Sequence, residues 1–407
     1  VVAAVRLPVI TARVRGTGSV EVRDVLVVAI GDSYAAGEGN PEMRRGWRGA
    51  ETRWGDGGDS AATAGHALHH RSTVAWTSRL ALALELDDPR SSVTFVNVAS
   101  SGARIDWGML TDQGANTTSQ LDQLAALVGS RPVDLLLVQE GGNSIGFARL
   151  VRALVEADPL FDPVCYRLMV DQAIAAVGDG NWRRGTALRF RLPFDWSCVT
   201  EERTSGAQLP GIAGLPDAFG RLDAALSQFD IGRVVLVGYP DPTGGGPDGA
   251  ECREIVGDVT PPLSFHEISR DEGRRGVSEV LAPLNAALAT IATDLGWDFV
   301  GGVAEAFAAG HGYCAPWPSY GPIDPGAPGF ATTPLDFPDA WYRNPGNEPF
   351  ADSGEAITWY RTAGQSVVLQ GPGEAFITEG TLHPNEVGHG VIARLVWEHL
   401  QADDWTG

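Results

Sequence analysis

A serine hydroxyl follows directly on an apolar run near the start of the chain. Residues 25–30 are apolar and rich in β-branched side chains, which is typical of a parallel strand buried on both faces. The run ends at Gly31, Asp32 and Ser33, and open α/β sheets place their chemistry beyond the carboxyl ends of such strands. Ser33 could therefore act as a nucleophile. Asp32 and Ser33 could equally well do no more than cap the next helix.

Two later strands end in turns that could present hydrogen-bond donors at the same edge of the sheet. Residues 93–98 read as a strand and lead into Gly102, whose small-residue turn would leave backbone N–H groups free. Residues 133–138 read as the next strand and lead into Asn143, which either makes a tight turn or presents its amide. We expect both to occupy the same relative position as Ser33.

A histidine near the end of the chain could supply a base. His383 precedes Pro384, so it lies on a constrained turn just before the last predicted helix, from which its imidazole can project. His389 falls within that helix and is expected to pack there.

These residue types fit the hydrolysis of an ester by a serine. The reaction needs an exposed hydroxyl, an imidazole that takes its proton, donors for the oxyanion, and a group that orients the imidazole. Ser33 and His383 supply the first two, and the N–H groups of Ser33 and Gly102 with the Asn143 amide supply donors. Losing one such donor typically costs roughly 2.7–4 kcal/mol of barrier. Ala35 stands where a G-x-S-x-G elbow needs its second glycine, which disfavours an α/β-hydrolase.

Four blocks of the chain resemble the SGNH hydrolases, also called the GDSL esterase/lipase family. The resemblance implies Ser33 as nucleophile, His383 as base, and Gly102 and Asn143 as oxyanion donors beside the Ser33 N–H. It also implies a flavodoxin-like three-layer α/β/α sandwich with a central parallel five-stranded sheet, a shallow open site, and no metal or organic cofactor. The blocks are GDSYAAGEGNP (31–41), SSGA (100–103), GGNSIGF (141–147) and HPNEVGH (383–389).

Within that family the chain is most similar to the secreted bacterial branch. HHRS at 69–72 resembles that branch's CHRS, and AFAAGHGYCAPW at 306–317 resembles a segment that ends in a disulfide-bonded cysteine. His69 and Ser100 stand where the branch often has a pair of cysteines, so one disulfide should be absent.

Two further departures concern the site itself. Ser144 replaces the usual aspartate of GGND, a structural residue in the family, so activity should survive. The family's acid lies three residues before the histidine, and Gly380 occupies that position here. Glu379 could reach His383 instead, or a backbone carbonyl could orient the ring and leave a Ser–His dyad.

Four cysteines without CxxC spacing point to disulfides rather than to a thiol-rich zinc site. The order of the cysteines in the sequence suggests two disulfide bridges. The alternatives are other pairings or four buried free thiols. Each bridge would be worth roughly 2–4 kcal/mol and implies an oxidising compartment. We therefore expect a secreted, extracellular protein whose signal peptide is not in this chain. The suggested pairs are Cys165–Cys198 and Cys252–Cys314.

The charge of the chain narrows its partners. The formal net charge is −21, and this negative charge disfavours nucleic acid and anionic membranes as partners. Every fixed positive side chain is an arginine. No apolar run of about 18 residues occurs, so no membrane span is expected. We expect a monomer that acts on a small-molecule ester, a lipid or an acylated carbohydrate. A metal hydrolase built on His66, His69 and His70 is a weaker alternative, because surface histidines explain them better and no carboxylate stands at a helical spacing to complete a ligand set.

One hydrolase domain is expected over residues 25–407. Residues 1–24 read as an N-terminal extension or edge strands, and loop insertions are expected at about 158–214, 243–272 and 301–380. The aromatic-rich third insertion could be a lid, a binding wall or a packed mini-core. A non-catalytic ligand-binding protein on the same scaffold is the alternative function. The remaining elements are expected as helices at 72–86, 145–155, 216–229 and 276–295 and strands at 233–237 and 297–300.

Overall fold

The computed structural model describes a central sheet, the helices around it and the segments that join them. The described residues are 2–6, 11–15, 23–38, 40, 69–72, 74–88, 90–114, 117–150, 163–182, 209–243, 270–308, 310–313, 359–360, 380, 382–403 and 405.

Five parallel strands form the central sheet, in the order β4-β3-β5-β6-β7. Counted along the chain this is the order 2-1-3-4-5 of the flavodoxin-like fold, which confirms the predicted architecture. The chain reverses its direction of strand addition between β3 and β5, where such folds place their ligands. The strands are β3 (Arg23–Gly31), β4 (Ser91–Asn97), β5 (Leu135–Gln139), β6 (Val234–Val237) and β7 (Asp298–Val300).

Alternation along β3 sends its side chains into two separate cores. Val25, Val27 and Ala29 pack on one face of the sheet, and Leu26, Val28 and Ile30 on the other. From Val25 onward every residue of the strand is buried, as the apolar run predicted. The strand predicted at 93–98 is also present as β4, but as an edge strand it is only partly buried.

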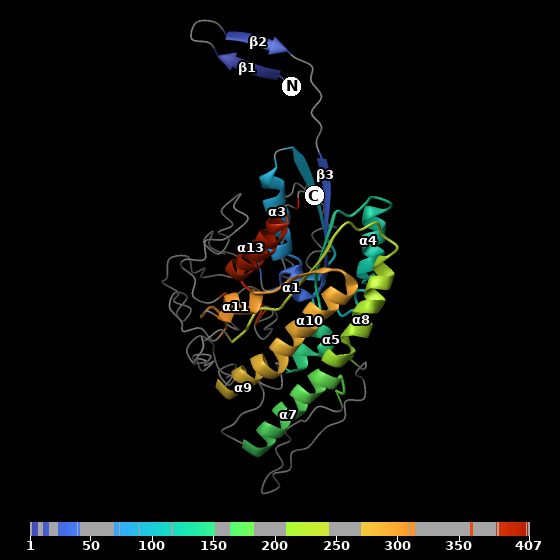
Figure 1. Cartoon of the computed structure of the whole chain (residues 1–407), viewed down its shortest axis with the longest axis vertical. Helices are drawn as coiled ribbons and strands as arrows, with labels where there is room; N and C mark the ends of the chain where they lie inside the picture. Colours follow the sequence, from blue (N-terminus) through green and yellow to red (C-terminus); the bar gives the residue numbers. More distant parts are fainter. Residues whose placement is uncertain are drawn as a thin grey trace, which may run out of the picture.

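Helices cover both faces of the sheet and make the three layers (Figure 1). The face that carries Val27 is covered by α3 (Trp76–Asp87), α11 (Val303–Ala308) and α13 (Glu386–Ala402). The face that carries Val28 is covered by α4 (Gln120–Val128), α8 (Gly211–Leu226) and α10 (Ala282–Leu295). The first and last core helices, α3 and α13, pack against each other, which brings the two ends of the fold together.

Several boundaries differ from the sequence prediction. The helix predicted at 72–86 is α3, which begins only at Trp76, with Ala75 in the N-cap position. The predicted excursion 158–214 contains a 17-residue helix, α7 (Pro163–Asp179), which packs on α8. Proline and glycine dominate the flanks of that segment and hid its helical pattern.

The helix predicted at 276–295 is the last part of a longer helical run. The run starts with α9 (Arg270–Arg275), passes through a π-helical segment, Gly276–Leu281, and continues as α10. Within the described residues it is the one stretch, Gly273–Leu295, that is long and apolar enough to cross a membrane. Leu284 and Leu288 pack in the core under the sheet, and such core helices meet the same criteria.

The N-terminal residues form a sheet of their own. β1 (Val2–Arg6) and β2 (Thr11–Arg15) pair antiparallel and make no ladder with the five-stranded sheet (Figure 1). β1 and β2 are therefore not edge strands of the central sheet, and an N-terminal extension over residues 1–24 stays a prediction.

Candidate active site

The turn that carries Ser33 is held at the carboxyl end of β3. A short helix, α1 (Ser33–Ala36), begins directly after the strand. Gly31 has φ +138°, and a Cβ there would lie 2.2 Å from the carbonyl oxygen of Gln139, so only glycine fits. The side chain of Gln120 accepts from the Gly31 N–H at 2.8 Å and donates to the Gly31 carbonyl at 2.7 Å. Both backbone groups of the turn are thus fixed.

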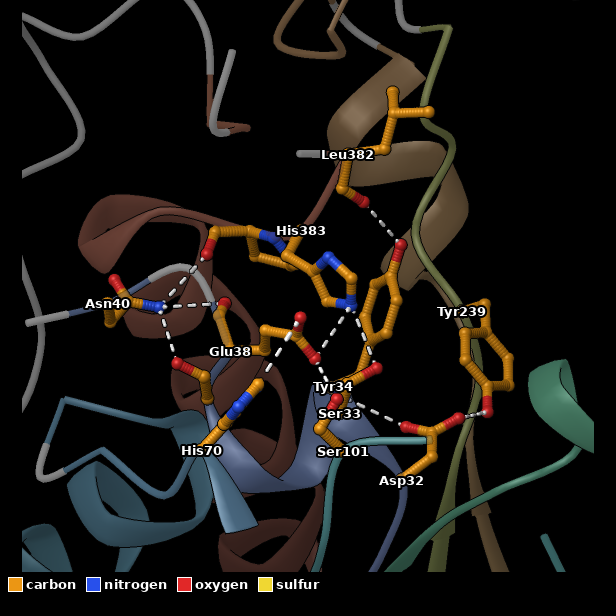
Figure 2. A network of polar contacts seen from close by, with 12 residues as sticks. Asp32, Ser33, Tyr34, Glu38, Asn40, His70, Ser101, Tyr239, Leu382 and His383 are labelled. Atoms are coloured by element: carbon orange, nitrogen blue, oxygen red, sulfur yellow. Dashed lines mark hydrogen bonds and ion pairs between the residues drawn. The ribbon is translucent and has the colours of Figure 1, made fainter. Parts of the chain in front are cut away.

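Asp32 performs the capping that the sequence allowed, and leaves Ser33 to face the histidine. Its Oδ1 accepts from the Tyr34 N–H at 2.9 Å at the start of α1, and its Oδ2 accepts from the hydroxyl of Tyr239 (Figure 2). Burial raises the pKa of Asp32 to about 7, against the lowering effect of these two hydrogen bonds; the charge of Glu38 raises it further.

The imidazole of His383 lies against the serine. Its Nε2 is 2.8 Å from Ser33 Oγ, across 350 positions of sequence (Figure 2). His383 precedes α13, whose N-cap Asn385 accepts from two backbone N–H groups. Leu382 takes the left-handed φ of +60°, and the Tyr34 hydroxyl donates to its carbonyl at 2.7 Å. Helix capping and Tyr34 therefore set the position of the ring from both sides.

His389 packs inside α13, as predicted, and it also serves α3. The side chain is fully buried, and its Nδ1 accepts from the Trp76 N–H at 3.2 Å. Ala75, the N-cap of α3, offers no side-chain acceptor, so His389 replaces a local cap.

The two predicted donor loops flank the Ser33 turn. After β4, the Ser100 N–H donates to the Gly31 carbonyl at 3.1 Å; beside it, the Asp32 N–H donates to the Gln139 carbonyl of β5 at 3.0 Å. Gly102 and Asn143 belong to these loops, Asn143 within the short helix α5 (Gly142–Ile145). Within the described part of the chain, neither the Gly102 N–H nor the Asn143 amide has a hydrogen-bond partner. Both remain able to donate to a ligand.

Ser144 joins the two donor loops. Its hydroxyl donates to Glu140 Oε1 at 2.8 Å and accepts from the Ile105 N–H at 3.3 Å. A hydroxyl can therefore do the bridging at the position where the resembled family has aspartate. Burial, and then the charge of Asp32, raise the pKa of Glu140 well above its usual range.

Sequence reasoning missed Glu38, a buried carboxylate beside the serine and the histidine. Its Oε2 accepts from the Ser101 hydroxyl and lies 3.8 Å from His383 Nε2, and its Oε1 lies 3.6 Å from His70 Nδ1 (Figure 2). Burial alone would raise the pKa of Glu38. The charge of His383, with the hydrogen bonds and charge from His70 and Ser101, lowers it instead to about 2.

The acid was expected a few residues before His383, whereas Glu38 comes from the block of the nucleophile. The signal was present as the glutamate of GDSYAAGEGNP, but nothing local to it indicates where its carboxylate points. Glu379 lies outside the described residues. Gly380 has no side chain that could orient the imidazole, but its carbonyl accepts from the His383 N–H at 3.1 Å.

Two of the three clustered histidines have defined contacts. His69 is only 7% exposed and its Nδ1 lies 2.9 Å from Ser100 Oγ, so the surface interpretation is wrong for this residue. The pair that stands where the resembled branch has cysteines is thus in contact. No group of three His, Cys, Asp or Glu side chains that could hold a metal occurs among the residues described. His66 lies outside them.

The disulfide predictions fall largely outside the described residues. Cys165 lies in α7 without a described side chain, and the structure does not describe Cys198, Cys252 or Cys314. Most of the insertions at 243–272 and 301–380 also lie outside. Both pairings stay predictions.

Comparisons with known proteins give similar folds without a sequence family. No family model matches the chain, and no curated protein matches it. An extracellular lipase from Streptomyces rimosus is similar at 18% identity and TM-score 0.46, over 92% of this chain and 99% of the lipase. Phospholipase A1 from Streptomyces albidoflavus NA297 has 16% identity and TM-score 0.41, over 92% and 98%. The acetylxylan esterase Axe2 from Geobacillus stearothermophilus has 11% identity and TM-score 0.31, over 94% and 96%. Likenesses this weak assign no chemistry to this chain.

Proposed function

We propose that this chain is a serine esterase or lipase of the SGNH (GDSL) type, which hydrolyses carboxylic esters through an acyl-enzyme on Ser33. The observation that carries the proposal is the 2.8 Å contact between Ser33 Oγ and His383 Nε2 at the carboxyl edge of the sheet. A hydroxyl is a weak nucleophile until a neighbouring base takes its proton, and this distance is that of a hydrogen bond.

The reaction would run in two halves. Ser33 Oγ attacks the acyl carbonyl as its proton moves to His383 Nε2, and the carbonyl electrons move onto the oxygen. The N–H groups of Ser33 and Gly102 and the Asn143 amide stabilise that oxyanion. His383 returns the proton to the leaving alcohol, and the acyl-enzyme remains. A water then attacks the acyl-enzyme with His383 again as base, and the acid is released.

The substrate class follows from the expected architecture. A short-chain ester, a lipid or an acylated carbohydrate would fit a shallow site, with aromatic side chains from the insertion at about 301–380 as its wall. Two disulfides among the four cysteines and an extracellular location complete the proposal. Residues 25–407 would form the hydrolase domain.

Hydrolysis of p-nitrophenyl esters of increasing chain length tests this function. Wild-type protein should hydrolyse at least the short esters, and Ser33→Ala should lower kcat at least about a thousandfold. Ser227→Ala, an exposed serine at the end of α8, is the matched control and should keep wild-type kcat. The chain-length profile separates an esterase from a lipase. Activity that persists in Ser33→Ala would contradict the proposal, and binding of esters without turnover would favour a ligand-binding protein.

A further inference from the structure

Glu38 approaches the imidazole at an unusual nitrogen. In a Ser–His–Asp triad the acid binds the ring nitrogen that faces away from the serine and fixes its tautomer. Here the carboxylate lies 3.8 Å from Nε2, which is the nitrogen that faces Ser33 Oγ (Figure 2). Glu38 and Ser33 therefore share one side of the ring.

The carboxylate is held in this place from several directions. The Glu38 N–H donates to the Ser33 carbonyl at 3.0 Å, so the glutamate is tied to the turn of the nucleophile. Asn40, fully buried, donates through Nδ2 to the Glu38 carbonyl at 3.4 Å and to the Pro384 carbonyl at 3.2 Å. The Ser101 hydroxyl holds Oε2. Glu38 is thus connected to the segments of both Ser33 and His383.

The surroundings also keep the carboxylate ionised. His383 and His70 lie beside it and lower its pKa, and its charge in turn raises the pKa of Asp32 and Tyr34. With a pKa lowered to about 2, Glu38 is negatively charged at neutral pH. A fixed negative charge in a buried site acts strongly on a positive charge 3.8 Å away, because little water screens it.

We propose that Glu38 is a positioning residue that stabilises the imidazolium of His383 during acyl transfer and holds its Nε2 edge toward Ser33. The inference rests on the proposed function. As the Ser33 O–H bond breaks, the Nε2–H bond forms and the ring becomes positive next to Glu38. The distance of 3.8 Å is too long for a hydrogen bond, so the carboxylate attracts the charge without taking the proton. The proton therefore stays available to the leaving alcohol.

Removal of the charge tests this role. Glu38→Gln keeps the shape of the side chain, and we expect it to lower kcat by about ten- to hundredfold with KM nearly unchanged. Without the negative charge the imidazole gives up its proton more easily, so the acidic limb of the pH profile should move to lower pH. Glu38→Asp keeps the charge, so it should retain part of the wild-type kcat and show the acidic limb of the pH profile at its wild-type position.

A second readout avoids dependence on the substrate. The rate at which a fluorophosphonate labels Ser33 reports the activated hydroxyl, and it should show the same loss and the same shift with pH. Ser101→Ala removes the hydroxyl that holds Oε2 but leaves the charge, so it should cost less than Glu38→Gln. If Glu38→Gln does not fold, Ser101→Ala still tests the positioning role of Glu38. It should slow the labelling of Ser33 without moving the acidic limb of the pH profile, and unchanged labelling would contradict the proposal.

The outcomes separate the two proposals. If Ser33→Ala is inactive while Glu38→Gln keeps kcat within twofold, the esterase stands and the role of Glu38 is wrong. A loss of kcat in Glu38→Gln with an unmoved pH limb would mean a purely structural role and would equally overturn the inference. If wild-type protein neither hydrolyses esters nor reacts with the fluorophosphonate, both proposals fail.

Discussion

Two carboxylates of one short block have opposite electrostatic surroundings. Asp32 and Glu38 are both buried, and burial by itself raises the pKa of each. Glu38 has two histidines beside it and stays ionised, whereas Asp32 faces Glu38, Glu140 and the hydroxyl of Tyr239. The neighbouring histidines decide which of the two carboxylates has the lowered pKa.

The raised pKa of Asp32 predicts a stability that falls as pH rises. With a folded pKa of about 7 against 3.8 in the unfolded chain, the native state binds more protons between pH 4 and 7. The free energy of unfolding should then fall by at most about 1.4 kcal/mol per pH unit in that window from this group. The pKa of Glu140 is also raised, so this group adds a pH dependence of stability with the same sign. The pKa of Glu38 is lowered, so Glu38 changes the stability only below pH 4.5, the pKa of a glutamate in the unfolded chain.

Urea unfolding from pH 5 to 7 checks this slope in wild-type protein and Asp32→Asn. Asparagine keeps an oxygen that can cap Tyr34, but it carries no proton equilibrium. The variant should lose less stability over the window than the wild type. Parallel slopes in the two proteins would contradict the assigned shift.

The elements position the site through their ends. β4, β3 and β5 lie side by side, so the turns after them meet at one edge and bring Gly102, Ser33 and Asn143 into neighbouring loops. α13 adds His383 from the far end of the chain, fixed by packing on α3 and by the Asn385 cap. Buried side chains hold these turns in place: Gln120 of α4 accepts from the Gly31 N–H, and Ser144 accepts from the Ile105 N–H.

The contact between His69 and Ser100 predicts an engineered disulfide. The two side chains touch at 2.9 Å and join the segment before α3 to the turn after β4. His69→Cys with Ser100→Cys should form a bridge in oxidising buffer and raise the free energy of unfolding by roughly 2–4 kcal/mol.

Unfolding with and without a reductant measures this gain. The native cysteines can also respond to the reductant, so the wild-type difference is subtracted, and His69→Cys alone is the matched control. A double variant that is no more stable in oxidising buffer than in reductant, after this subtraction, would show that the two segments cannot be bridged.

At the scale of the whole molecule, charge works against stability. The net charge of −21 at pH 7 arises from 51 acidic and 30 basic side chains, so the folded protein repels itself. Salt should screen this repulsion, since the Debye length falls from about 30 Å at 0.01 M to about 8 Å at 0.15 M.

Tm should therefore rise by a few degrees between 10 mM and 200 mM NaCl at pH 7. The rise should be smaller at pH 5, closer to the sequence pI of about 4.7, where the net charge is lower. A Tm that falls with salt would indicate that attractive ion pairs, such as Arg233 with Asp298 and Asp403, outweigh the repulsion.

The sequence by itself predicted the parallel sheet and the pair of Ser33 and His383 at its carboxyl edge. Buried parallel strands need continuous apolar runs, and residues 25–30 and 135–138 are such runs. The turns after them carry glycine and small polar residues, which made Ser33, Gly102 and Asn143 candidates for a site. His383 was recognisable because a proline follows it just ahead of the last helix.

Only the tertiary structure decided which side chains touch across long distances in sequence. Glu38 and His383 are 345 positions apart in the sequence, and no local sequence pattern indicates such a contact. The same holds for His389, which accepts from the Trp76 N–H, and for Tyr34, whose hydroxyl donates to the carbonyl of Leu382. Local sequence sets backbone preference and burial, whereas the direction of a buried polar side chain depends on partners that the packing of distant elements supplies.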